Sequence, residues 1–242
     1  MPRVGRRLGT TLLIAIVAVA GLFAFAPREP LDLDSYLRDR EAVVGGITPG
    51  TEKRILWAGA AGARTDWAVV YLHGFSATSE EIRPVPDRVA AGLGANLYFT
   101  RLAGYGLATA VLTWPFARHW VTYLAGREQC FKTMSEGHAR FWTTCYPTEA
   151  PVPMVALAGH AAAADYSGVT VPALFLFAEA DQGTSPAATR TVAEGWGGPV
   201  AVLPQGVGAG DDPHSHVIAG DIRSPSMTAP VTQAILDWAG AL

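Results

Sequence analysis

Residues 171–186 read VPALFLFAEADQGTSP, and this stretch decides the fold class. Its centre, residues 173–177 (ALFLF), is a continuous apolar run of the kind that is buried in a parallel sheet. The carboxylates Glu179 and Asp181 follow the run directly, and a helix is predicted over residues 186–196. A strand that leads through a polar loop into a helix is the repeating unit of an α/β fold.

The same alternation extends on both sides of this stretch. Further strands are predicted at residues 54–58, 67–72, 96–102 and 200–203, where β-branched and aromatic residues gather. Helices are predicted at residues 31–44, 151–164 and 228–242, and from a cap at Thr78 or Ser79 to residue 91. The pattern predicts an α/β fold with a mostly parallel sheet flanked by helices.

Composition places the chain among globular proteins with one substantial core. It has 242 residues, of which 50% are hydrophobic and 16% are charged, which argues against disorder. Of the 18 basic residues, three arginines lie before residue 27. The rest of the chain has 15 basic and 21 acidic residues and is therefore mildly acidic. A mildly acidic domain with no basic cluster is a poor candidate for binding nucleic acid, so we expect no nucleic-acid partner.

The N-terminus carries a targeting signal. A basic start is followed by an apolar run at residues 8–26, which as a helix would span roughly 28 Å, close to the thickness of a bilayer core. We expect residues 1–27 to be a signal-anchor that crosses the membrane through residues 8–26, or a cleaved signal peptide; a buried helix is the third interpretation. Residues 24–26 (AFA) have the small-x-small form of a cleavage site, but Pro27 is a poor context for it. Under the first two interpretations residues 28–242 face outward, either membrane-anchored in the periplasm or outside the cell, or secreted.

The two cysteines, Cys130 and Cys145, form a disulfide in the simplest interpretation for an exported domain. Two unpaired buried thiols are the alternative. The nearby His138 does not complete a zinc site with them, so we expect no metal and no cofactor.

Two polar loops supply candidate chemistry. Residues 179–181 follow a predicted late strand, and residues 211–216 (DDPHSH) form a later loop with two histidines. A carboxylate that holds a histidine in one tautomer, so that the histidine can take a proton from a nucleophile, is the acid–base part of a hydrolase triad. An acid after a late strand and a histidine on a later loop occur in the chain order of such triads.

Three segments resemble the α/β-hydrolase superfamily, in its carboxylesterase and lipase-like branch. Residues 69–81 (VVYLHGFSATSEE) resemble its oxyanion-loop region, residues 171–186 its acid-bearing strand and loop, and residues 214–222 (HSHVIAGDI) its histidine loop. The resemblance covers about half of the chain. It implies that Asp181 is the triad acid, that His216 is the base and that the backbone N–H of Phe75 is an oxyanion-hole donor. The implied substrate is a small apolar ester or a lipid-like molecule.

Alternatives remain for each of these residues. Glu179 is the alternative acid and His214 the alternative base. Asp181 and His216 could also be ordinary surface residues with no catalytic role. We expect His73, which ends a predicted buried strand, to be structural.

The chain departs from the family pattern at the nucleophile. No G-x-S-x-G turn occurs anywhere in the sequence, and no serine lies between Ser79 and Ser135. Residues 104–106 (GYG) resemble the loop before the nucleophile turn and residue 107 starts a segment that resembles the helix after it, so one strand-turn-helix unit is missing between them. We therefore expect a sheet that is incomplete in the middle and ester hydrolysis that is impaired or lost. A non-catalytic ligand-binding or partner-binding protein is the alternative, as is another nucleophile at Ser76, Ser135 or Cys130.

The region between the two halves is rich in aromatic residues. Eight of them lie between residues 114 and 146, and residues 107–167 are predicted to form a cap over an apolar acyl pocket. Ordinary core packing is the alternative.

Overall fold

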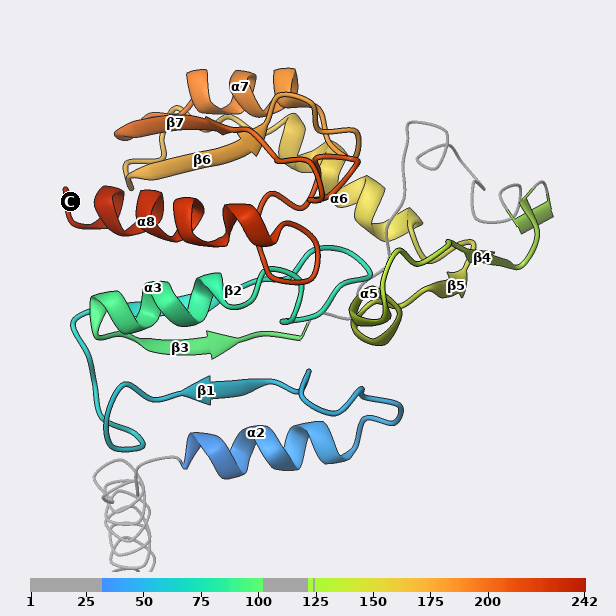
Figure 1. Ribbon diagram of the computed structural model, residues 1–242, viewed down its shortest axis with the longest axis horizontal. Coiled ribbons are helices and arrows are strands. Elements are labelled where there is room, and N and C mark those ends of the chain that lie inside the picture. The colour runs from blue at the N-terminus through green and yellow to red at the C-terminus, as the bar shows by residue number, and fades with distance from the viewer. Residues whose placement is uncertain (1–31, 102–121, 124) are drawn as a thin grey trace, which may run out of the picture.

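The computed structural model of the protein describes residues 32–101, 122–123 and 125–242. Helices and short strands alternate along the chain (Figure 1). In order they are α2 (Leu33–Ala42), β1 (Arg54–Leu56), β2 (Ala68–Tyr71), α3 (Val85–Leu93), β3 (Asn96–Phe99), β4 (Glu128–Cys130), α5 (Glu136–Phe141), β5 (Cys145–Pro147), α6 (Val152–Ala162), β6 (Ala173–Ala178), α7 (Pro186–Glu194), β7 (Val200–Gln205), the 3-10 helix η2 (Pro225–Met227) and α8 (Thr228–Ala239).

The chain is an α/β protein in the general sense, but its strands form three small sheets. The first has the order β1-β3-β2, with β2 parallel and β1 antiparallel to β3. The second is the parallel pair β6-β7, and the third is the antiparallel pair β4-β5. The expectation of one mostly parallel sheet is therefore corrected. Within the described residues no strand pairs with the second edge of β2 or of β6, so the two parallel pairs stay separate.

The helices α3 and α8 hold the first two sheets together. In Figure 1, β6 and β7 lie between α7 and α8, and α3 lies beside α8. Val69 of β2 and Leu176 of β6 both pack against one buried cluster, which consists of Val85, Val89, Ala219 and Val231. Burial of apolar surface in this cluster joins the halves, because no strand pairing links the two sheets among the described residues. One backbone hydrogen bond, from the N–H of Asp221 to the carbonyl of Arg83, adds to it.

The hairpin β4–β5 and the helix α5 form a separate unit at the side of the core, which we call the cap segment, residues 128–147 (Figure 1). Cys130 lies opposite Cys145 in the hairpin, with α-carbons 4.2 Å apart, and the two form a disulfide as the sequence predicts. The predicted cap region also includes residues 107–121, which lie outside the described residues.

The expectation of a membrane anchor also needs correction. None of the described helices combines the length and the apolar character needed to cross a membrane. The longest of them, α8, has 12 residues and is therefore about 18 Å long, against a bilayer core of roughly 30 Å. The apolar run at residues 8–26 lies outside the described residues.

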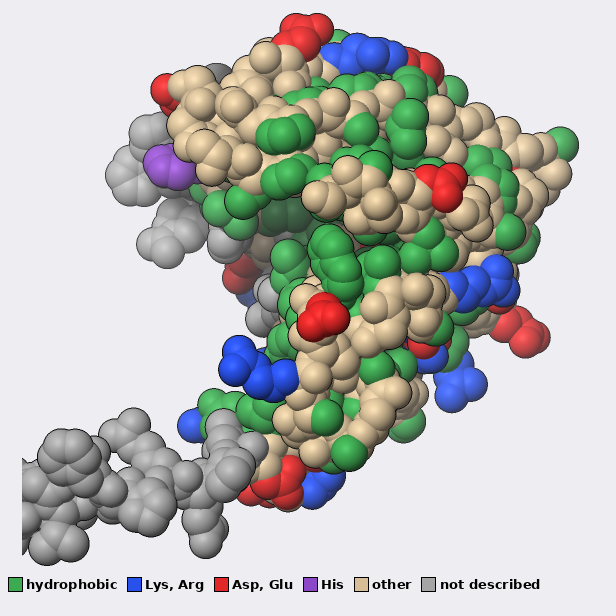
Figure 2. All heavy atoms as spheres, turned by 90° about the vertical axis from the view of Figure 1, so that its left-hand side faces the viewer, with side chains coloured by type: hydrophobic (Ala, Val, Ile, Leu, Met, Phe, Trp, Pro, Cys, Tyr) green, Lys and Arg blue, Asp and Glu red, His purple; other side chains and the backbone are tan. Residues whose placement is uncertain are grey.

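Hydrophobic side chains remain on the surface. Val70 and Leu72, at and just after the end of β2, are 57% and 63% exposed. Figure 2 shows hydrophobic side chains gathered across the middle of one face of the molecule.

Candidate functional site

A cavity of about 710 Å³ opens between the core and the cap segment. Five parts of the chain meet around it: the loop after β2, the cap segment, Met154 of α6, the loop after β6 and the loop before η2. Its lining includes Gly74, Phe75, Ser76, Glu81, Phe131, His138, Trp142, Tyr146, Gln182, Gly183, Thr184, His214, His216 and Arg223. The mixture of aromatic rings and a few polar groups suits a small organic ligand with an apolar part.

The loop after β6 and the loop before η2 bring Asp181 and His216 together. Nδ1 of His216 lies 3.1 Å from Oδ1 and 3.2 Å from Oδ2 of Asp181. The Asp181 side chain is 5% exposed, whereas that of His216 is 47% exposed. With a carboxylate at Nδ1, the favoured tautomer of a neutral His216 carries its proton there, which leaves Nε2 able to accept one.

Hydrogen bonds from its own loop keep Asp181 ionised. Burial alone would raise the pKa of Asp181, but the hydroxyl and backbone N–H of Thr184, the N–H of Gly183 and the ring of His216 together hold it below the ordinary 3.8. The carboxylate is therefore charged at neutral pH and can orient the imidazole and stabilise its protonated form.

The loop that carries His216 is built around Asp212. This carboxylate, whose side chain is fully buried, accepts hydrogen bonds from the backbone N–H groups of His214 at 3.2 Å, His216 at 3.2 Å and Val217 at 2.9 Å. Between the two histidines, Ser215 takes a left-handed conformation with φ of 53°. A non-glycine residue adopts this conformation only when surrounding bonds hold it there.

Arg223 connects Asp212 to the cap segment. Its guanidinium donates to Oδ1 of Asp212 and lies 3.1 Å from Nδ1 of His138 and 2.9 Å from Sδ of Met134. Burial, and after it the charge of Arg223, lower the pKa of His138 below 6.5, so this imidazole is neutral at pH 7. No role was predicted for His138, and Asp212, Arg223 and Met134 are not among the candidate residues of the sequence.

The rival residues have other partners. Glu179 pairs with Arg190 on the surface, where the two side chains are 53% and 44% exposed. Nδ1 of His214 lies 3.3 Å from Oε1 of Gln182. His214 lines the cavity, but its orienting partner is a neutral amide rather than a carboxylate.

The loop after β2 forms the opposite wall. Phe75 lines the cavity, and its ring meets the ring of Tyr146 edge-on at 5.7 Å. The N–H of Gly74 donates to Glu81 at 2.7 Å, and the carbonyl of Ser76 accepts from the N–H of Thr143 at 2.7 Å. A hydrogen bond within the loop and contacts from the cap segment therefore fix the loop that carries the predicted oxyanion donor.

The three candidate nucleophiles differ in position. Cys130 is in the disulfide, and the hydroxyl of Ser135 caps α5 by accepting from the N–H of His138. Ser76 alone of the three lines the cavity, in a left-handed conformation with φ of 60°. It does not follow a strand and precede a helix in the manner of a nucleophile turn.

The described residues contain one group with the spacing of metal ligands, Glu128 with Cys130 and Cys145. The two sulfurs are bonded to each other, so this group does not offer a thiolate pair to a metal.

Comparison with protein-family models and with curated proteins found no match to this chain.

Proposed function

We propose that the chain carries the acid–base half of an α/β-hydrolase-type ester hydrolase. Asp181 orients His216, and His216 is the general base and acid. The contact of Nδ1 of His216 with both carboxylate oxygens of Asp181 is the observation that carries the proposal. It joins two loops that are 35 residues apart in the chain and that the sequence analysis matched to the acid and histidine loops of that superfamily.

The proposed ligand is a small carboxylic ester with an apolar acyl part. Aromatic side chains of the cap segment, Phe131, Trp142 and Tyr146, line one side of the cavity, and His216 lines the other. In this proposal the carbonyl oxygen of the ester faces the backbone N–H of Phe75, whose donor role rests on the resemblance of residues 69–81 to an oxyanion loop.

The break in the sheet supports the second part of the proposal, that turnover is impaired. A nucleophile turn sits at the end of a central strand, and β2 and β6 each lack a neighbour on one edge within the described residues. The sequence contains no G-x-S-x-G. Loss of the serine of a hydrolase triad lowers turnover by about 10⁶-fold, so an ester would bind but would react very slowly.

A non-catalytic ligand-binding protein of the same fold is the second candidate, and the lack of a G-x-S-x-G serine favours it. The two candidates share the cavity and differ in what His216 does. In the first, His216 still speeds the slow hydrolysis of a bound ester; in the second, replacing His216 changes nothing but the fit of the ligand.

The disulfide favours an oxidising compartment as the place of action, such as the periplasm or the extracellular space. The proposal therefore includes export of the domain in a secreted form.

One experiment tests the proposal. Short-chain aryl esters are titrated while the fluorescence of Trp142 is followed, with Trp142→Phe as the control, and product release is measured in parallel. We expect saturable binding, slow hydrolysis and a further loss of hydrolysis in His216→Ala. A folded chain that neither binds nor hydrolyses these esters would contradict the proposal. Binding with hydrolysis that His216→Ala does not lower would favour the second candidate.

A further inference from the structure

We propose that Asp212 is the positioning residue of His216, and that Arg223 ties this positioning to the cap segment. The inference rests on the proposed function, because it concerns how His216 is held against Asp181. Asp212 does not contact the reacting atoms in this account; it acts through the backbone of the loop that carries His216.

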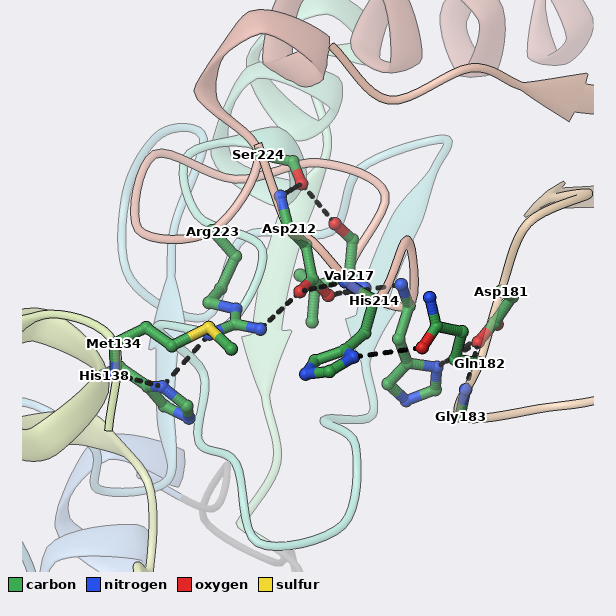
Figure 3. A network of polar contacts seen from close by, with 11 residues as sticks. Met134, His138, Asp181, Gln182, Gly183, Asp212, His214, Val217, Arg223 and Ser224 are labelled. Atoms are coloured by element: carbon green, nitrogen blue, oxygen red, sulfur yellow. Dashed lines mark hydrogen bonds and ion pairs between the residues drawn. The ribbon is translucent and has the colours of Figure 1, made fainter. Parts of the chain in front are cut away.

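The contacts of Asp212 are concentrated on that loop. Its two carboxylate oxygens accept three backbone N–H groups, from His214, His216 and Val217, within five residues of Asp212 itself. Figure 3 shows Asp212 beside His214 and Val217. The backbone N–H of Asp212 donates to the hydroxyl of Ser224 at 3.2 Å, and that hydroxyl donates to the carbonyl of Val217. The loop is thus closed on itself around one buried charge.

The geometry at His216 depends on this closure. Ser215 holds a left-handed conformation directly before His216, and a residue other than glycine keeps such a conformation only where its surroundings hold it there. If the carboxylate at the centre is neutralised, the loop loses the acceptor that imposes the turn. Among the described residues, hydrogen bonding to Asp181 is then the one polar contact that keeps Nδ1 of the half-exposed His216 ring in place.

Arg223 extends the arrangement to the cap segment. The Arg223 and Asp212 side chains are 8% and 0% exposed, so the pair is desolvated. The other end of the guanidinium faces His138 of α5 and Met134, both more than 80 residues away in the chain. A displacement of the cap segment therefore moves Arg223 and, through Asp212, the loop of His216.

The test compares Asp212→Asn with Asp211→Asn. Asp211 is the matched control, because it is the adjacent buried carboxylate and accepts from the N–H of Gly208 at 2.7 Å and from the N–H and hydroxyl of Ser226, without touching the His216 loop. The readout is the ring ¹⁵N chemical shifts of His216, followed with rising pH to the plateau at which they report the tautomer of the neutral ring. Near-ultraviolet circular dichroism verifies that each variant is folded.

We expect the Nδ1–H tautomer in the unaltered chain and in Asp211→Asn, and a mixture of tautomers in folded Asp212→Asn. A change of stability alone would not shift the tautomer of a folded chain. If Asp212→Asn does not fold, Arg223→Lys is the second variant, since a lysine ammonium cannot reach Asp212 and His138 together; it should lose part of the tautomer preference.

The outcomes separate this inference from the function on which it rests. Suppose that the unaltered chain has the Nδ1–H tautomer and that folded Asp212→Asn keeps it. This result would overturn the positioning role alone, and so would an unchanged tautomer in Arg223→Lys where that variant is needed. A mixture of tautomers already in the unaltered chain would overturn both.

Discussion

The His216 ring occupies the space in which a side chain at Gly183 would lie. A Cβ atom built on Gly183 would lie 2.6 Å from Nδ1 and 2.7 Å from Cγ of His216, closer than such atoms approach in proteins. Cγ is bound to the Cβ of His216, so the ring cannot yield by bending at its tip. The contact between His216 and Asp181 therefore requires glycine two residues after the acid.

Gly183→Ala should drive the His216 ring away from Asp181. Because His216 is half exposed, the ring can turn toward solvent, and we expect the free energy of unfolding to change by about 1 kcal/mol or less. The ring ¹⁵N shifts of His216 should report loss of the Nδ1–H tautomer. Gly206→Ala is the control, since nothing lies within 4 Å of the added Cβ there. An unchanged His216 signal in Gly183→Ala would show that the ring does not sit where the structure places it.

The buried pair of Asp212 and Arg223 should matter far more for stability than the exposed pair of Glu179 and Arg190. Asp212→Ala leaves the guanidinium of Arg223 buried without a carboxylate, which costs about 3–5 kcal/mol. Glu179→Ala removes a pair in which both side chains are exposed, which costs about 0–1 kcal/mol. Urea unfolding of both variants measures the difference, and equal losses would contradict the burial of the Asp212 pair.

Reduction of the disulfide should destabilise the chain. The bond between Cys130 and Cys145 closes a loop with a sequence separation of 15, for which chain entropy gives about 3 kcal/mol. Alkylation of the native protein without reductant should label neither cysteine, and the double variant with serine at both positions should unfold at lower urea concentration. Labelling of both thiols in the native protein would contradict the pairing.

Stability should fall with pH in two separate windows. The pKa of His138 is lowered in the folded state. On acidification, His138 of the unfolded chain therefore binds a proton near pH 6.5, whereas His138 of the folded chain binds it only at lower pH. Its contribution is therefore complete above that pH and is lost as the pH falls toward the folded pKa. The carboxyl groups of Asp181, Asp211 and Asp212 have lowered pKa values and lose their contribution in a second window below about pH 3.8.

His138→Gln isolates the upper window. Its free energy of unfolding should be flatter than that of the unaltered chain as the pH is lowered from about 7 to 5, with the lower window unchanged. His160→Gln on the surface of α6 is the control. Identical curves for His138→Gln and the unaltered chain would show that His138 is not buried against Arg223.

Local sequence patterns predicted most elements and one contact of the site. The strands β2, β6 and β7 lie within two residues of their predicted bounds, because each combines β-branched or aromatic residues with clear breakers. The strand β3 begins at Asn96 as predicted but ends at Phe99, three residues before its predicted end. The start of α3 was predicted at Thr78 or Ser79, which was wrong. The helix begins at Val85, because the proline at position 86 has no N–H to donate and fits only the first turn.

The remainder depends on contacts that no local pattern encodes. The division into separate sheets depends on which strands pair with each other, and this pairing joins residues that are far apart in the chain. The short antiparallel pair β4–β5 lies in a region without clear periodicity. The contact of Arg223 with His138 spans 85 residues. Asp212 is one of two adjacent aspartates after a glycine-rich run, and no local pattern distinguishes it from Asp211. The one available signal was the run of two aspartates just before two histidines, which could have pointed to a carboxylate that organises the loop.

The central claim is that Asp181 and His216 form a hydrolase acid–base pair that lacks its serine. The most direct measurement is fluorophosphonate labelling of a chain in which a family-like G-x-S-x-G unit has been inserted between Gly106 and Leu107. We expect stoichiometric labelling at the inserted serine, none after His216→Ala in the same chain, and none in the unaltered chain. A folded restored chain that is not labelled, or that is labelled equally well with His216→Ala, would contradict the account. So would stoichiometric labelling of the unaltered chain at a single serine such as Ser76.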